Sequence, residues 1–180
     1  QTASANKILA EGLATWVPRI KHHGNAFQVV GTAGSGKTQL ALTLLRDASS
    51  KGKKTAYVCY NRPLADHIAK IAPPSSIVSN FDDLTISHFR RTVDSIDFEE
   101  VGIYKKAAAS YIEYISSNEP RLDLLIIDEA QDFESEWISA LASLVRESGK
   151  LYTLADESQL IYKRERFEID KAVTVECHEN

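Results

Sequence analysis

An α/β fold, with a parallel sheet covered by helices on both faces, is what this 180-residue sequence predicts. Short apolar runs alternate along the chain with segments in which apolar residues recur every three or four positions, which is typical of strands that alternate with helices. This alternation indicates parallel strands joined by crossover helices. A glycine-rich segment between the first apolar run and the following helix favours the same class.

The first elements are expected before residue 61. Apolar residues at helical spacing predict a helix over residues 3–20. The apolar run 26–30 stops at a glycine and predicts a buried strand. A second helix is expected over 36–49, where leucine and alanine side chains share one face, and a second strand over 55–60.

The middle of the chain is expected to be mostly helical. A short helix is predicted over 64–71, because two prolines follow it and end it. A strand is expected over 76–79. Residues 83–118 show helical periodicity throughout, so we expect them to form helix over their whole length.

The last elements again alternate. The run 124–127 is wholly aliphatic and predicts a buried strand, and apolar residues at helical spacing predict a helix over about 137–145. Two further apolar runs, 151–154 and 172–175, predict strands.

Composition limits the classes of function. The chain has 43% hydrophobic and 26% charged residues, which is ordinary for one globular domain. No apolar run approaches the length that crosses a bilayer, so we expect no membrane association. The two cysteines lie far apart, which favours a reducing, cytoplasmic location. A net charge of −4 means that any nucleic-acid contact must be a local patch.

Residues 31–38 form the first chemical motif, Gly-Thr-Ala-Gly-Ser-Gly-Lys-Thr. A strand precedes it and a helix follows it, as a phosphate-binding loop requires. The loop would bind a nucleotide such as ATP through Gly31, Gly34, Ser35 and Gly36, with Lys37 on the β- and γ-phosphates and the Thr38 hydroxyl on Mg²⁺. The alternative is a glycine-rich turn that only caps a helix.

The second motif ends the run at 124–127. Asp128 and Glu129 follow four aliphatic residues directly. At the tip of a strand beside a phosphate loop, Asp128 is expected to bind Mg²⁺ and Glu129 to activate the attacking water. An acidic helix start, favoured by the helix dipole, is the alternative. It explains Asp132 and Glu134 well but not this adjacent pair.

A third stretch, residues 151–159, also runs from an apolar strand into an acid and an amide. Gln159 at its end could sense the γ-phosphate and report hydrolysis. An exposed glutamine in a turn is the alternative for this residue.

Four stretches in order, GTAGSGKT, AYVCYNRPLADHI, LLIIDEAQDF and LADESQLIY, resemble the motifs of UvrD/Rep-like superfamily 1 helicases. The resemblance runs from about residue 26 to the end and implies the first RecA-like domain of such a motor, a P-loop NTPase fold. It supports ATP and Mg²⁺ as cofactors and Glu129 as the general base. It also implies that Gln131 and Gln159 contact the γ-phosphate region.

The same resemblance implies contacts with single-stranded DNA, with RNA as the alternative. Its second and third motifs fall on Tyr60, Asn61, Arg62, Asn80 and Phe81. After Gln159 the family usually has a tryptophan and an arginine, whereas this chain has Tyr162 and Arg164. Tyr162 is a candidate for base stacking, with burial in the core as the alternative, and the basic residues around Arg164 could equally be a solvated surface.

The domain plan also follows from the resemblance. We expect residues 1–180 to form a single RecA-like ATP-binding domain, with a small helical insertion at about 83–120. The second RecA-like domain of the same parent chain is absent from this sequence, and its arginines would complete the active site.

We therefore expect the ATP-binding half of an ATP-dependent helicase or translocase, nearly inactive as an isolated fragment. Two other classes stay open. One is a P-loop ATPase that acts as a regulatory switch without translocation. The other is a small-molecule kinase, against which the Asp128–Glu129 pair and Gln131 speak, because a kinase has no need of a water-activating glutamate.

Overall fold

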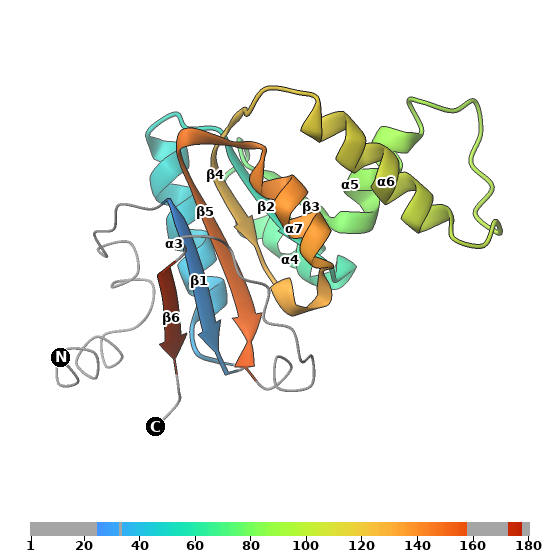
Figure 1. Ribbon diagram of the computed structural model, residues 1–180. Helices are drawn as coiled ribbons and strands as arrows, with labels where there is room; N and C mark the ends of the chain where they lie inside the picture. The colour runs from blue at the N-terminus through green and yellow to red at the C-terminus, as the bar shows by residue number, and fades with distance from the viewer. Residues whose placement is uncertain (1–24, 33, 158–172, 178–180) are drawn as a thin grey trace, which may run out of the picture.

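The computed structural model describes residues 25–32, 34–157 and 173–177. Within these residues six strands form one sheet in the order β3-β2-β4-β5-β1-β6, and every neighbouring pair is parallel (Figure 1). Helices cover both faces, so the predicted α/β class is confirmed. The helix expected over residues 3–20 lies outside the described residues.

The elements lie close to their predicted positions. The strands are β1 (Ala26–Gly31), β2 (Thr55–Cys59), β3 (Ile77–Asn80), β4 (Leu122–Ile127), β5 (Val145–Asp156) and β6 (Val173–Cys177). The helices are α3 (Lys37–Ser50), α4 (Arg62–Ile71), α5 (Phe81–Phe89), α6 (Ile103–Ser116) and α7 (Ser135–Ala142), with a 3-10 helix η2 (Ala130–Asp132).

Alternate side chains of each strand serve two separate cores, because successive residues of a strand point to opposite faces of a sheet. Tyr57 and Cys59 of β2 belong to the core under α3 and α4. Ala56 and Val58 belong to the core under α6 and α7. The central strands are therefore apolar on both faces, which explains their uninterrupted aliphatic sequence.

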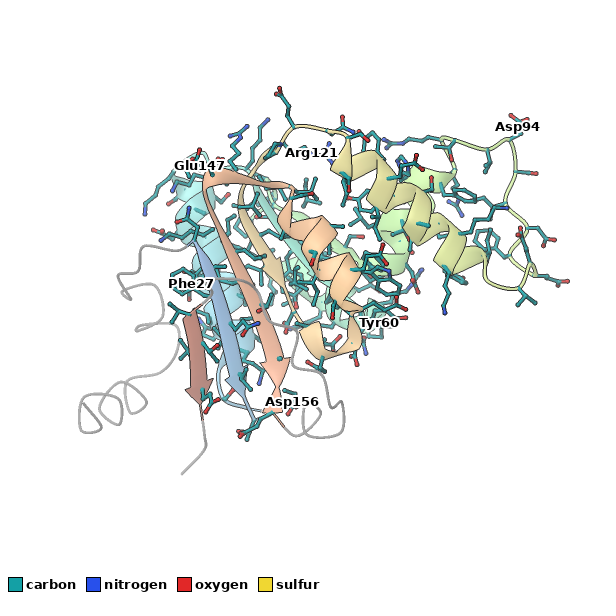
Figure 2. All side chains as sticks on the ribbon, viewed as in Figure 1. Phe27, Tyr60, Asp94, Arg121, Glu147 and Asp156 are labelled. Carbon is teal, nitrogen blue, oxygen red and sulfur yellow. The ribbon has the colours of Figure 1, made fainter. Side chains whose placement is uncertain are left out.

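The expectation of helix over all of 83–118 is wrong in its middle. Residues 90–102 separate α5 from α6 and form no helix. Gly102 begins α6 with a φ of +85°, a conformation that glycine adopts readily. α5 and α6 extend beside the sheet, and residues 90–102 lie at the far end, where Figure 2 labels Asp94. A small core of their own joins them, formed by Ile86, Phe89, Ile103 and Ala107.

The helix expected to reach residue 145 ends at Ala142, and Val145 begins β5. The apolar periodicity continued because Leu144 and Val145 still pack into the same core. The backbone, however, leaves the helix after Ser143. The Leu144 carbonyl accepts from the backbone N–H groups of Arg121 and Leu122, at 2.9 and 2.8 Å, and so joins the start of β4.

All six strands end at the same edge of the sheet, because they are parallel. Figure 2 labels Asp156 at this edge, and Glu147 and Arg121 at the opposite edge. The glycine-rich loop after β1 and the acids after β4 therefore meet at one edge, which positions the site described next. None of the described helices is both long and apolar enough to cross a membrane.

Candidate nucleotide site

Two glycines shape the loop between β1 and α3. Gly34 and Gly36 have φ values of +81° and +87°, in the left-handed region that side chains disfavour. Gly36 is the N-cap of α3, and its carbonyl accepts from the Leu40 N–H at 2.9 Å. A Cβ at Gly36 would meet no atom within 4 Å, so the backbone conformation rather than lack of space requires glycine here.

Lys37 extends back over this loop. Its Nζ donates to the carbonyl oxygens of Gly31 and Thr32, at 2.8 and 2.7 Å, and to Ser35 Oγ at 3.1 Å. The loop is closed by a bond from the Ser35 N–H to the Thr32 carbonyl at 3.2 Å. The ammonium group is thus held over the loop by neutral acceptors, which phosphate oxygens can replace with stronger, charge-assisted bonds.

Asp128 lies directly after β4 and is buried, with 6% of its surface exposed. Tyr57 Oη donates to its Oδ2 at 2.6 Å, and the Glu129 N–H donates to its Oδ1 at 2.8 Å. Burial raises the pKa of Asp128, while these two hydrogen bonds and the Lys37 charge lower it. Each carboxylate oxygen has a donor, so the group is fixed in orientation before any metal binds.

Glu129 has a left-handed backbone, with φ 51° and ψ 40°. No other described residue except glycine has a positive φ. Such a conformation is costly for a glutamate and is found more often at functional sites than elsewhere. Its Oε2 accepts from the Asn61 N–H at 3.1 Å. Partial burial raises the pKa of Glu129, the Asn61 bond lowers it, and the charges of Asp128 and Asp132 raise it further.

Gln131 joins the ends of two strands. It is buried, with 5% of its surface exposed, and its Oε1 accepts from the Asp156 N–H at 3.1 Å. The amide therefore bridges from η2, after β4, to the end of β5.

One cavity of about 620 Å³ contains these groups. Lys37, Thr38, Asp128, Glu129 and Gln131 all line it, as do side chains of α3 and α4. The volume lies within the range of small-molecule sites. The structure thus brings together two groups of predicted residues that are at least ninety positions apart in the sequence.

The donor set fits Mg²⁺ bound together with a nucleotide. Thr38 offers an exposed hydroxyl at the start of α3, and Asp128 a fixed carboxylate. Mg²⁺ is commonly held by one or two protein oxygens plus phosphates and waters. Among the described residues no cluster of three His, Cys, Asp or Glu side chains could hold a metal without such a ligand.

Tyr60 and Arg62 remain at the surface. Tyr60 is 40% exposed and lies beside α7 (Figure 2), with its ring parallel to that of Trp137 at 6.5 Å. Partial burial raises the pKa of Tyr60, as do the carboxylates of Asp82, Asp132 and Glu134. Arg62 is paired with Asp83. The surface therefore combines an aromatic face with bordering carboxylates, which suits contacts with bases better than with phosphates.

Asn80 and Phe81 are placed differently from the expectation. Asn80 is 3% exposed and caps α5, where its Oδ1 accepts from the Asp83 N–H at 2.9 Å. Phe81 is 1% exposed and stacks on Trp137 at 4.5 Å. Both side chains hold the start of α5 in place, so in this structure neither is offered to a nucleic acid. A helix cap and a polar contact residue use the same side chains, so the sequence pattern alone does not separate the two roles.

Three predicted residues, Gln159, Tyr162 and Arg164, lie outside the described residues. Sequence reasoning missed Tyr57, whose hydroxyl holds Asp128. A signal was present, because a tyrosine in a buried apolar strand needs a hydrogen-bond partner for its hydroxyl. The pairing of β2 with β4 aligns Val58 with Ile127, and so brings the Tyr57 strand alongside Asp128.

Comparison with known proteins gives one family. The family model described as Schlafen group 3, DNA/RNA helicase domain, matches residues 25–176. This supports a helicase-like P-loop domain, but not the narrower UvrD/Rep-like group that the motifs resemble. No curated protein matches the chain.

Two solved structures show a limited similarity to the chain. The large terminase of a thermophilic bacteriophage has a TM-score of 0.45 and 10% identity, over 96% of this chain and 44% of the terminase. The N-terminal domain of the bacteriophage phi29 DNA packaging ATPase has a TM-score of 0.42 and 14% identity, over 83% of this chain and 88% of that domain. The chain thus spans less than half of the terminase. At these scores and identities the two structures indicate no function for it.

Proposed function

The chain belongs to the Schlafen group 3 DNA/RNA helicase domain family, and from this premise we propose that it binds Mg²⁺-ATP and hydrolyses it in response to single-stranded nucleic acid. In the parent protein this hydrolysis would drive movement along the strand. We propose DNA as the strand, with RNA as the alternative.

The observation that carries this proposal is the cavity that unites the phosphate loop with Asp128, Glu129 and Gln131. A site that only binds nucleotide needs the loop and a metal ligand. A site that hydrolyses nucleotide also needs a group that orients and deprotonates water. Glu129 and Gln131 line the same cavity as Lys37 and are suited to that second task.

Each side chain has a distinct role in this proposal. Lys37 would leave its carbonyl acceptors and donate to the β- and γ-phosphates. Thr38 and Asp128 would hold Mg²⁺, which neutralises charge on the phosphates when it is bound. Glu129 would take a proton from the attacking water, helped by the raised pKa that burial gives its carboxylate.

The nucleic acid would lie at the carboxyl edge of the sheet, over Tyr60 and Arg62. We propose base stacking on Tyr60, since its ring is exposed and supported by Trp137. Consistent with the motif resemblance, we propose that a second RecA-like domain of the parent chain covers the cavity. A reducing cytoplasmic location suits Cys59, which is buried as a thiol.

Calorimetric titration with Mg²⁺-ATP tests the nucleotide site. Lys37→Ala should remove most of the affinity, since it deletes the charge on the phosphates. Lys70→Ala, an exposed lysine in the last turn of α4, is the matched control and should bind as the parent does. Equal binding by Lys37→Ala would refute the loop assignment.

Phosphate release by the intact protein, with and without oligothymidine or oligouridine, tests the rest. Stimulation by one of these strands is the expected result, and the larger effect identifies the preferred nucleic acid. Hydrolysis indifferent to both would argue for a regulatory switch rather than a motor.

A further inference from the structure

The carboxylate of the proposed general base is held by the backbone of a different strand. Glu129 follows β4, whereas its Oε2 accepts from the N–H of Asn61, just after β2, at 3.1 Å. The two residues are 68 positions apart in sequence. Nothing in the phosphate loop takes part in this contact.

Asn61 is fixed on its other side too. Its carbonyl accepts from the Ala65 N–H at 3.1 Å and from Cys59 Sγ at 3.2 Å. Its side-chain oxygen accepts from the Leu64 N–H at 3.1 Å and caps α4. The Asn61 N–H therefore presents Glu129 with a donor at a well-defined position.

The backbone of Glu129 is fixed as well. Its N–H donates to Asp128 Oδ1 at 2.8 Å, and its carbonyl accepts from the Asp132 N–H at 2.9 Å. Only the side chain is able to turn without disturbing η2. Leaving Asn61 would turn the carboxylate within the cavity that Glu129 lines together with Lys37 and Gln131.

The residues on either side of Asn61 are those proposed to meet nucleic acid. Tyr60 is 40% exposed, and Arg62 is exposed as well. Base carbonyl oxygens are hydrogen-bond acceptors, as is the Glu129 carboxylate. A strand seated over Tyr60 and Arg62 thus brings competing acceptors to the N–H that holds Glu129.

We propose that the Asn61 N–H is a lock on Glu129: it turns the carboxylate away from the water position until single-stranded nucleic acid engages residues 60–62 and releases it. Asn61 is then a positioning residue that couples the track to hydrolysis. This inference rests on the proposed function and gives it a mechanism of regulation.

Removal of one N–H tests the lock. Asn61→Pro deletes the donor at a residue whose φ of −82° lies near that of proline, and Asn61→Ala loses the same cap but keeps the donor. Phosphate release by the intact protein without nucleic acid should be about tenfold or more faster in Asn61→Pro than in Asn61→Ala, because a bond from N–H to carboxylate is among the stronger ones. Stimulation by oligothymidine should fall by the same factor. Equal unstimulated rates in two folded variants would overturn the lock.

A second measurement needs no proline variant. The chemical shift of the Asn61 amide proton is followed by ¹⁵N-resolved nuclear magnetic resonance. The Glu129→Ala variant gives the chemical shift of this amide without its bond to the carboxylate. Saturating oligothymidine should shift the wild-type amide away from its Glu129-bound resonance, because the amide then loses the Glu129 carboxylate as its acceptor. The inference would be overturned if the Asn61 amide shift were the same in Glu129→Ala as in the parent. It would also be overturned if the shift stayed constant while fluorescence anisotropy showed that the oligonucleotide was bound. Either result would leave the proposed function standing. If no oligonucleotide binds, the proposed function fails. The comparison of unstimulated rates in Asn61→Pro and Asn61→Ala then still shows whether the Asn61 N–H restrains Glu129.

Discussion

Deletion of a single buried hydroxyl, in Tyr57→Phe, should destabilise the nucleotide-free protein through Asp128. Tyr57 is fully buried, and its hydroxyl donates to Asp128 Oδ2 at 2.6 Å. Burial and the Asp128 charge raise the pKa of Tyr57 well above its ordinary value, so the hydroxyl keeps its proton. The ring itself is unchanged in phenylalanine, and no cavity larger than one oxygen atom results.

The size of the effect follows from the charge of the acceptor. A hydrogen bond to a charged group contributes about 1.5–3 kcal/mol, and a bond between neutral groups about 0.5–1.5 kcal/mol. Tyr57→Phe should therefore lower the free energy of unfolding by about 1.5–3 kcal/mol at neutral pH. For a protein of this size that corresponds to a fall in Tm of roughly 3–12 °C.

Urea unfolding of four proteins isolates the bond: the parent, Tyr57→Phe, Asp128→Asn and the double variant. In the Asp128→Asn background the hydroxyl meets a neutral amide, so Tyr57→Phe should cost about 1 kcal/mol less than in the parent. The cost in the parent should also shrink as the pH falls. Burial raises the pKa of Asp128 above its ordinary 3.8, so the carboxylate protonates and the charged bond weakens before the pH reaches that value.

Equal costs in both backgrounds, or a cost that stays constant from neutral to acid pH, would refute this reasoning. Either result would mean that Tyr57 acts through packing rather than through the Asp128 carboxylate.

Three further predictions concern neighbouring groups. Asp128→Asn should raise the unfolding free energy at neutral pH, because a carboxyl whose pKa is raised by burial stabilises the fold fully only while it is protonated. Thermal unfolding should show that this gain vanishes at acid pH. Glu129→Gln should still bind Mg²⁺-ATP in calorimetry but turn over about 10²–10⁴-fold more slowly, and an unchanged rate would place the base elsewhere. Gly36 and Gly102 have nearly the same φ, +87° and +85°, so Gly102→Ala is the control for Gly36→Ala. Each variant should lose about 1–2 kcal/mol of stability. Calorimetry should find weaker ATP binding only in Gly36→Ala. Equal affinities in the two glycine variants would contradict the role of Gly36 in the phosphate loop.

The sheet was predictable because its signals are local. Uninterrupted aliphatic runs such as 124–127 indicate a strand buried on both faces, whatever the rest of the chain does. The position of the loop between β1 and α3 was predictable for a related reason, because the spacing of its glycines and lysine is typical of a turn between a strand and a helix. Boundaries were harder, since Leu144 and Val145 pack into the helical core although the backbone has already become strand.

What sequence reasoning could not supply were contacts between strands that are distant in the chain. Tyr57 meets Asp128, and Asn61 meets Glu129, only because β2 lies next to β4 in the sheet. The strand order is a property of the whole fold, and no local pattern reports it. Asn80 shows a second limit of sequence reasoning, because a polar side chain before a helix predicts a cap as well as it predicts a binding residue.

The small separate core of α5 and α6 has an evolutionary and practical consequence. Ile86, Phe89, Ile103 and Ala107 pack with one another, outside the two cores that hold the sheet. Residues 90–102 join α5 to α6 at the end that lies away from the sheet (Figure 1). Residues inserted into 90–102 would lengthen a surface loop at small entropic cost, and the strand ends would stay in place. The segment is therefore where the chain can gain sequence, by natural insertion or as a grafted reporter, without moving the residues that line the cavity at the strand ends.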